Sequence, residues 1–81
     1  MKTAYSNNDL KVLDFIALRL LNYSRINYSY LLEAIEGKFS VSNADILVQE
    51  AFLASNMAEI SRDHISLVNR DTLEKFHTEL N

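Results

Sequence analysis

The sequence contains no cysteine, no proline, no tryptophan and a single glycine among its 81 residues. Without cysteine, a disulfide framework, a cysteine-based zinc site and a cysteine nucleophile are excluded. One glycine excludes a phosphate-binding loop of the usual glycine-rich kind. The shortage of glycine and proline also leaves few chain breaks, and no linker, repeat or low-complexity segment is visible.

Long apolar runs and a strong charge of either sign are missing as well. No segment approaches the roughly 20 apolar residues of a membrane span, and the start of the chain, MKTAYSNND, lacks the apolar stretch of a secretory signal. Hydrophobic residues make up 48%, and 8 basic against 11 acidic residues give a net charge of −3, which argues against disorder. We therefore expect one soluble, cytoplasmic domain at residues 9–81, after a flexible N-terminus at residues 1–8.

Helical periodicity begins after Asn8 and Asp9, either of which suits the N-cap of a first helix. Phe15 and Leu18 lie off its apolar stripe, so this helix has more apolar surface than one core contact requires. The residues of the stripe recur at three- and four-residue steps: Leu10, Leu13, Ile16, Ala17, Leu20 and Leu21.

Two further helices follow. Asn27 suits the N-cap of a short second helix, and Gly37 is expected to end it in a left-handed conformation. Ser42 and Asp45 have the spacing of a capping box for a third helix, with Ser40 as the alternative cap. The inward stripe of the third helix is predicted to be Ala44, Leu47, Val48, Ala51 and Ala54, with Phe52 at its margin.

After Asn56 the period changes to that of strands, with Arg62 and Asp63 as the expected turn. This turn has no glycine, so a tight two-residue hairpin is not favoured and a longer loop is the alternative. A last helix opens at Asp71. It is predicted to bury one face, formed by Leu73, Phe76, His77 and Leu80. The predicted fold class is mainly α with a small β-hairpin and a C-terminal helix.

The order of these elements from Leu10 to Leu80 is helix, helix, short turn, helix, hairpin, helix. In this order the chain resembles the winged-helix superfamily. The resemblance implies a three-helix core, a recognition helix at residues 42–56 that enters the DNA major groove, and a wing at residues 57–69.

The charge of the expected recognition helix disagrees with DNA binding. No lysine or arginine lies between residues 39 and 61, whereas Asp45, Glu50 and Glu59 do. Because cations that neutralise phosphates supply much of the affinity for DNA, duplex DNA is a disfavoured partner. A dimeric winged-helix DNA-binding repressor remains the alternative. Its contacts would be Arg25, Lys38, Gln49, Asn56 and Arg62.

The apolar residues off the helical stripes favour protein contacts instead, because each loses about 1.5–3 kcal/mol of burial if it is left in water. We therefore predict a small, non-enzymatic regulatory or adaptor protein that binds an unidentified protein and also itself, as a homodimer. The predicted protein interface consists of Phe15, Leu18, Ile46, Gln49 and Leu53.

The histidines indicate no chemistry. His64 is expected to be an exposed strand residue and His77 a half-buried helix residue, with no metal-ligand spacing around either. No serine lies in a nucleophile elbow. No catalytic residue, cofactor, metal or small-molecule substrate is therefore predicted.

Three tyrosines cluster beside Arg25: Tyr23, Tyr28 and Tyr30. Tyrosine and arginine are typical of a core or a protein interface. Stacking on single-stranded nucleic acid is the third, less favoured interpretation.

Overall fold

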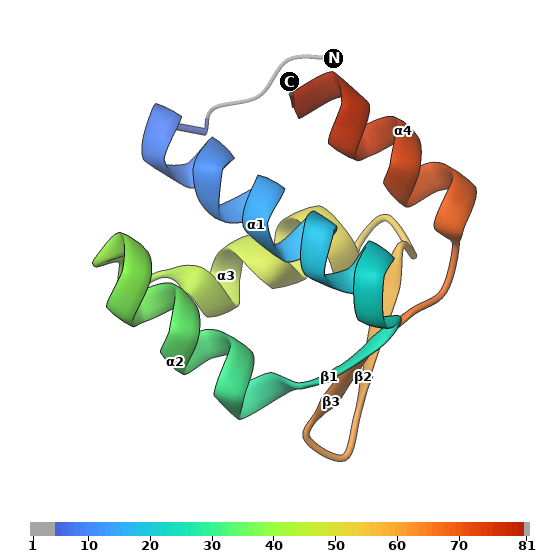
Figure 1. The fold of residues 1–81 in the computed structure, drawn as a ribbon, viewed down its shortest axis with the longest axis horizontal. Coiled ribbons are helices and arrows are strands. Elements are labelled where there is room, and N and C mark those ends of the chain that lie inside the picture. The colour runs from blue at the N-terminus through green and yellow to red at the C-terminus, as the bar shows by residue number, and fades with distance from the viewer. Residues whose placement is uncertain (1–4, 81) are drawn as a thin grey trace.

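A computed structural model describes residues 5–80, and its mainly helical fold with a small antiparallel sheet agrees with the predicted class (Figure 1). Of the expected flexible N-terminus at residues 1–8, the first four positions lie outside the described residues. The elements are α1 (Asn7–Tyr23), β1 (Arg25–Asn27), α2 (Tyr28–Phe39), α3 (Ala44–Val48), the π-helix η1 (Gln49–Leu53), β2 (Ala58–Ser61), β3 (His64–Leu67) and α4 (Arg70–Leu80).

Helix α1 is capped by Ser6, so the predicted cap at Asn8 or Asp9 is wrong. The Ser6 hydroxyl accepts a hydrogen bond from the Asp9 amide at 3.1 Å. The Asp9 carboxylate accepts one in return from the Ser6 amide at 3.4 Å. This reciprocal capping box satisfies two backbone donors, whereas a cap at Asn8 or Asp9 would satisfy one.

Helix α2 begins as predicted and ends later than predicted. The Asn27 side chain caps it by accepting a hydrogen bond from the Tyr30 amide at 2.8 Å. Gly37 does not terminate it. The helix continues to Phe39, and Ser40 takes the left-handed conformation with φ 56°. The two extra residues bring the Phe39 ring edge-on to Phe15, with centroids 5.6 Å apart.

The third helical segment differs from the predicted regular helix. No side chain caps α3, so the predicted capping box and the alternative cap at Ser40 are wrong. After Val48 the backbone widens into η1, where the Ala54 amide donates to the Gln49 carbonyl five residues earlier. The wider turn rotates Phe52 from the predicted margin into the core and leaves Ala54 exposed. Phe52 then meets Phe76 of α4 edge-on at 5.5 Å.

The sheet has three antiparallel strands in the order β1-β3-β2. The two strands of the hairpin were predicted, whereas β1 was not. Their turn is a tight one, so the expectation against a two-residue hairpin is wrong. Arg62 and Asp63 both have a left-handed backbone, with φ 57° and 78°. Hydrogen bonds from the start of α2 to Asp63 hold this geometry without glycine.

Helix α1 lies in the middle of the molecule and contacts the other three helices (Figure 1). As predicted, Leu73, Phe76, His77 and Leu80 share the less exposed face of α4, and Leu73, Phe76 and Leu80 pack into or against the core. The fully buried core side chains come from every helical segment and from the sheet, and the largest are Phe52, Leu13, Ile16, Leu20, Leu31, Ile35, Ile65 and Leu73.

Candidate protein-interaction site

A cleft of about 390 Å³ lies between α1 and α2, with β1 along it. We call it the α1–α2 cleft. Its lining residues are Phe15, Arg19 and Tyr23 of α1, Arg25, Ile26 and Asn27 of β1, and Tyr30, Leu31 and Ala34 of α2. An adjoining hollow shares Phe15, Arg19 and Tyr23 with the cleft and adds Leu18 and Asn22.

One arginine of the cleft stands between two aromatic rings of the same helix. The Arg19 guanidinium lies 5.0 Å from the Phe15 ring centre and 5.9 Å from the Tyr23 ring centre. The spacing of four residues places all three side chains on one helix face. Cation–π attraction therefore positions Arg19 while its N–H groups remain available.

Large apolar side chains are exposed around the cleft and the hollow. Leu18 is 46% exposed, Tyr23 62% and Tyr30 69%. Tyrosine presents an apolar ring together with a polar hydroxyl, and it loses little conformational freedom when it is covered. These three side chains form an exposed rim that a partner can cover.

The lining of the cleft is positively charged, although the chain as a whole is acidic. Arg19 and Arg25 line it, and none of its lining residues is acidic, although the net charge of the chain is −3. Within residues 5–80, neither guanidinium makes an ion pair or a hydrogen bond. Both arginines can therefore bind an anionic group of a partner without first breaking an internal ion pair or hydrogen bond.

The structure gathers part of the predicted protein interface at this place. Phe15 lines the cleft as a half-buried residue, and Leu18 lies in the adjoining hollow. Ile46, 54% exposed, and the exposed Gln49 belong to α3 and η1 and do not line the cleft. Leu53 packs against the core.

The exposed polar groups of α3 and η1 bind one another. The Asp45 carboxylate accepts hydrogen bonds from the Tyr28 hydroxyl at 2.5 Å and from the Gln49 amide at 3.2 Å. Partial burial, joined by this hydrogen bond to Asp45, raises the pKa of Tyr28 above its ordinary value. The Gln49 amide is therefore already engaged inside the molecule.

The residues of the alternative DNA-binding interpretation come from five segments: Arg25 from β1, Lys38 from the end of α2, Gln49 from η1, Asn56 from the loop after η1 and Arg62 from the hairpin turn. Only Arg25 among them lines the cleft. The Lys38 ammonium lies 5.8 Å from the ring centre of its neighbour Phe39.

Arg19 lines the cleft but is not among the site residues predicted from the sequence. The sequence does hold a signal for it. Phe15, Arg19 and Tyr23 follow one another at four-residue steps, a spacing that stacks aromatic, cation and aromatic on one helix face. The partner elements of that face, β1 and α2, are not visible in the pattern of α1 alone.

The two histidines have different surroundings. His64 is half-buried, which corrects the predicted exposed position, and its Nδ1 is buried without a hydrogen-bond partner among the described residues. His77 is half-buried as predicted. Its Nε2 lies 2.8 Å from an Asp14 carboxylate oxygen and joins α4 to α1.

Among residues 5–80, no three His, Asp or Glu side chains gather in a group that could hold a metal ion. No helix in that range combines the length and the apolar character needed to cross a bilayer. The chain matches no protein-family model, no curated protein and no solved structure.

Proposed function

We propose that this chain is a small, non-enzymatic regulatory or adaptor protein that acts in the cytoplasm through protein–protein contacts. The observation that carries the proposal is the exposed rim of Leu18, Tyr23 and Tyr30 around the cleft and its adjoining hollow. Beside it lie Arg19 and Arg25, which form no ion pair with any of residues 5–80. Tyrosine and arginine supply much of the binding energy where proteins associate. A cleft of this composition favours a protein partner over a small substrate.

We further propose a winged-helix-like scaffold for this function. The order of the three core helices, the hairpin and α4 supports it. In that scaffold α3 and η1 would take the place of the recognition helix, and β2 with β3 would form the wing. The proposal is that contact with partners has moved from α3 to the α1–α2 cleft.

The charges of α3 and η1 support this change of surface. Their exposed side carries Asp45 and Glu50, and no lysine or arginine lies between residues 39 and 61. A duplex needs cations at its phosphates before base contacts can act. Since the side-chain amide of Gln49 already donates a hydrogen bond to Asp45, it is not free to donate one to a base.

Self-association through the hollow beside the cleft is the form of protein contact that can be tested first. Sedimentation velocity from low to high micromolar concentration is expected to show a dimer for the wild type. Leu18→Glu is expected to give a monomer with an unchanged far-UV spectrum, because it places a charge on an exposed apolar rim. Val68→Glu is the matched control, since Val68 is 52% exposed and lies outside the cleft and the hollow.

Two results would contradict the proposal. A wild type that stays monomeric to high micromolar concentration would remove self-association. Duplex binding at physiological salt that is lost on Gln49→Ala or Asn56→Ala would instead favour the DNA-binding repressor.

A further inference from the structure

Strand β1 has a free edge, because the order β1-β3-β2 places it on the outside of the sheet. Toward β3, the Leu67 amide donates to the Ser24 carbonyl and the Tyr28 amide donates to the Asp63 carbonyl, both at 2.7 Å. In an antiparallel pair, only every second residue forms backbone hydrogen bonds with the neighbouring strand. Since Ser24 and Tyr28 form such bonds, Ile26, which pairs with Ile65, is the residue of β1 whose backbone groups face β3.

The backbone groups of the two other strand residues therefore point away from the sheet. Within residues 5–80, neither the Arg25 amide nor the Asn27 amide donates a hydrogen bond to a partner outside the sheet. The alternation along β1 leaves both amides, together with the Arg25 carbonyl, on the free edge. An edge of this kind is a template for an added strand.

This edge borders the α1–α2 cleft, since all three residues of β1 line it. A chain that entered the cleft in extended form would meet backbone donors and an acceptor along one side. It would also meet the guanidinium groups of Arg19 and Arg25 and the exposed rings of Tyr23 and Tyr30. With no acidic residue in the lining, carboxylates are the groups that complement the cleft.

We propose that the α1–α2 cleft binds an extended, acidic segment of a partner protein, which adds to the sheet as a fourth strand beside β1. The proposal rests on the proposed function as a protein-binding module and names its partner class. Backbone hydrogen bonds to β1 require the ligand to be extended. Ion pairs with Arg19 and Arg25 give the cleft its preference for acidic side chains.

A peptide fits these features better than nucleic acid or a second copy. Nucleic acid has no backbone ladder to pair with β1, and the cleft offers only two cations for its phosphates. In a second copy, the other free sheet edge within the described residues is β2, which carries one carboxylate, that of Glu59. A single carboxylate leaves one of the two arginines unpaired.

The first experiment measures fluorescence anisotropy of a labelled peptide in which glutamates alternate with valines around one phenylalanine. We expect the full chain to bind it, and to bind the twin peptide with glutamine for glutamate at least about 10-fold more weakly, because charge-assisted hydrogen bonds are lost. Arg25→Glu should abolish binding of the acidic peptide and allow binding of a twin with lysine. Lys75→Ala is the control, since it removes a cation from α4 outside the cleft.

The second experiment measures hydrogen exchange of individual amides by NMR. Adding the acidic peptide is expected to slow exchange at Arg25 and Asn27 and to leave Ile26, which already faces β3, unchanged. N-methylation of the peptide amide that pairs with the Arg25 carbonyl should abolish binding, whereas methylation of the adjacent amides should not. Both readouts use the wild-type chain, so they do not depend on a variant that folds.

Several outcomes would overturn the inference. These are equal affinity for the glutamate and glutamine peptides, binding without protection of Arg25 and Asn27, and displacement of the peptide by a short thymidine oligonucleotide. Protection that rises with protein concentration alone would show that a second copy occupies the edge. A monomeric chain that binds the peptide would remove only the self-association proposed above. A chain that dimerises through Leu18 but ignores the peptide would remove only this inference.

Discussion

Asp63 has an unusual concentration of contacts for an exposed side chain. Its carboxylate accepts hydrogen bonds from the Ser29 hydroxyl at 2.8 Å and from the Asn27 amide group at 3.1 Å. Its carbonyl accepts one from the Tyr28 amide. The hydrogen bond from Ser29, joined by the one from Asn27, lowers the pKa of the Asp63 carboxyl against an opposing effect of desolvation. One residue thus holds the hairpin turn against the start of α2.

The lowered pKa predicts how Asp63→Asn affects stability as a function of pH. A carboxyl with a depressed folded-state pKa stabilises the fold above its unfolded value of 3.8, and this contribution is lost as pH falls through the folded value. We expect Asp63→Asn to be less stable than wild type at neutral pH and the difference to shrink below pH 3.8. Asparagine tolerates the left-handed backbone, so the turn itself is retained.

Urea denaturation midpoints from neutral to acidic pH measure this difference, with Glu59→Gln as an exposed control. A destabilisation that stays constant over the whole pH range would assign the effect to the turn backbone instead of the carboxylate.

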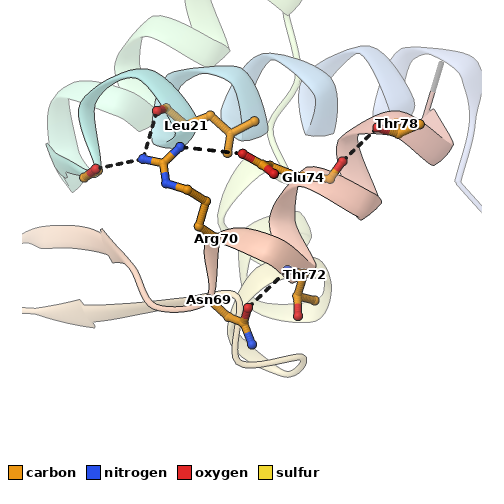
Figure 2. Close-up of polar contacts among 7 residues, drawn as sticks. Leu21, Asn69, Arg70, Thr72, Glu74 and Thr78 are labelled. Atoms are coloured by element: carbon orange, nitrogen blue, oxygen red, sulfur yellow. Dashed lines mark hydrogen bonds and ion pairs between the residues drawn. The ribbon is translucent and has the colours of Figure 1, made fainter.

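At the scale of elements, Arg70 ties the start of α4 to the end of α1. Its guanidinium donates to the Leu21 carbonyl at 3.2 Å and to the Ser24 hydroxyl at 3.4 Å, and it lies 4.0 Å from the Glu74 carboxylate (Figure 2). The last carbonyls of a helix have no partner within it. Arg70 therefore supplies α1 with a cap from a distant part of the chain.

Arg70→Ala is expected to lower the free energy of unfolding by about 1 kcal/mol, the usual contribution of a hydrogen bond of this kind. Exchange of the amides in the last turn of α1 should also become faster. Glu74→Ala should have a smaller effect, because exposed ion pairs contribute little. Thermal denaturation of the two variants compares these effects. An equal loss in both would show that the ion pair, and not the cap, is the main contribution.

Elements that are determined by residues close in the sequence could be predicted. Elements that depend on contacts with residues far away in the sequence could not. The Asn27 cap and the apolar face of α4 depend on neighbours within a few residues, and both predictions are confirmed. Strand β1 is three residues long and is a strand only because β3 pairs with it. The tight turn without glycine depends on contacts of Asp63 with α2. The turn was therefore mispredicted and β1 was missed.

In the candidate site too, the local pattern predicted individual residues but not which of them lie together. The sequence pattern identified Phe15 and Leu18 as apolar residues off their stripe, and Arg25 as a cation beside tyrosines, in two separate hypotheses. The structure places all three at one cleft and its adjoining hollow. Periodicity shows which face of a helix a residue occupies, but it does not show which other element lies opposite that face. Ile46 was selected by the same reasoning and lies elsewhere, on α3.

At the scale of the whole molecule, the two halves of the chain share one sheet and one core. Strand β1 lies between α1 and α2, yet its partner β3 belongs to the hairpin before α4. One cluster of buried apolar residues takes side chains from both halves, from Val12 of α1 to Leu73 of α4. We therefore expect one cooperative unfolding transition.

Far-UV circular dichroism and tyrosine fluorescence in urea measure this cooperativity. The first reports on the helices, and the second reports in part on Tyr28, whose hydroxyl bonds Asp45 of α3. We expect the two midpoints to coincide. A fluorescence midpoint at lower urea than the circular dichroism midpoint would show that α2 and α3 separate before the helices unfold.

The pairing of β1 with β3 also sets an order of events while the chain is being synthesised. Asn27 and Asp63, which bond one another, stand 36 residues apart in the sequence. A ribosome makes α1, β1 and α2 well before the hairpin exists, and contacts between distant residues form only after the intervening loop closes. Until then the three residues of β1 have no strand to lie beside. The cleft of a nascent chain is therefore without its sheet edge, and a partner that recognises this edge binds only after the hairpin has docked.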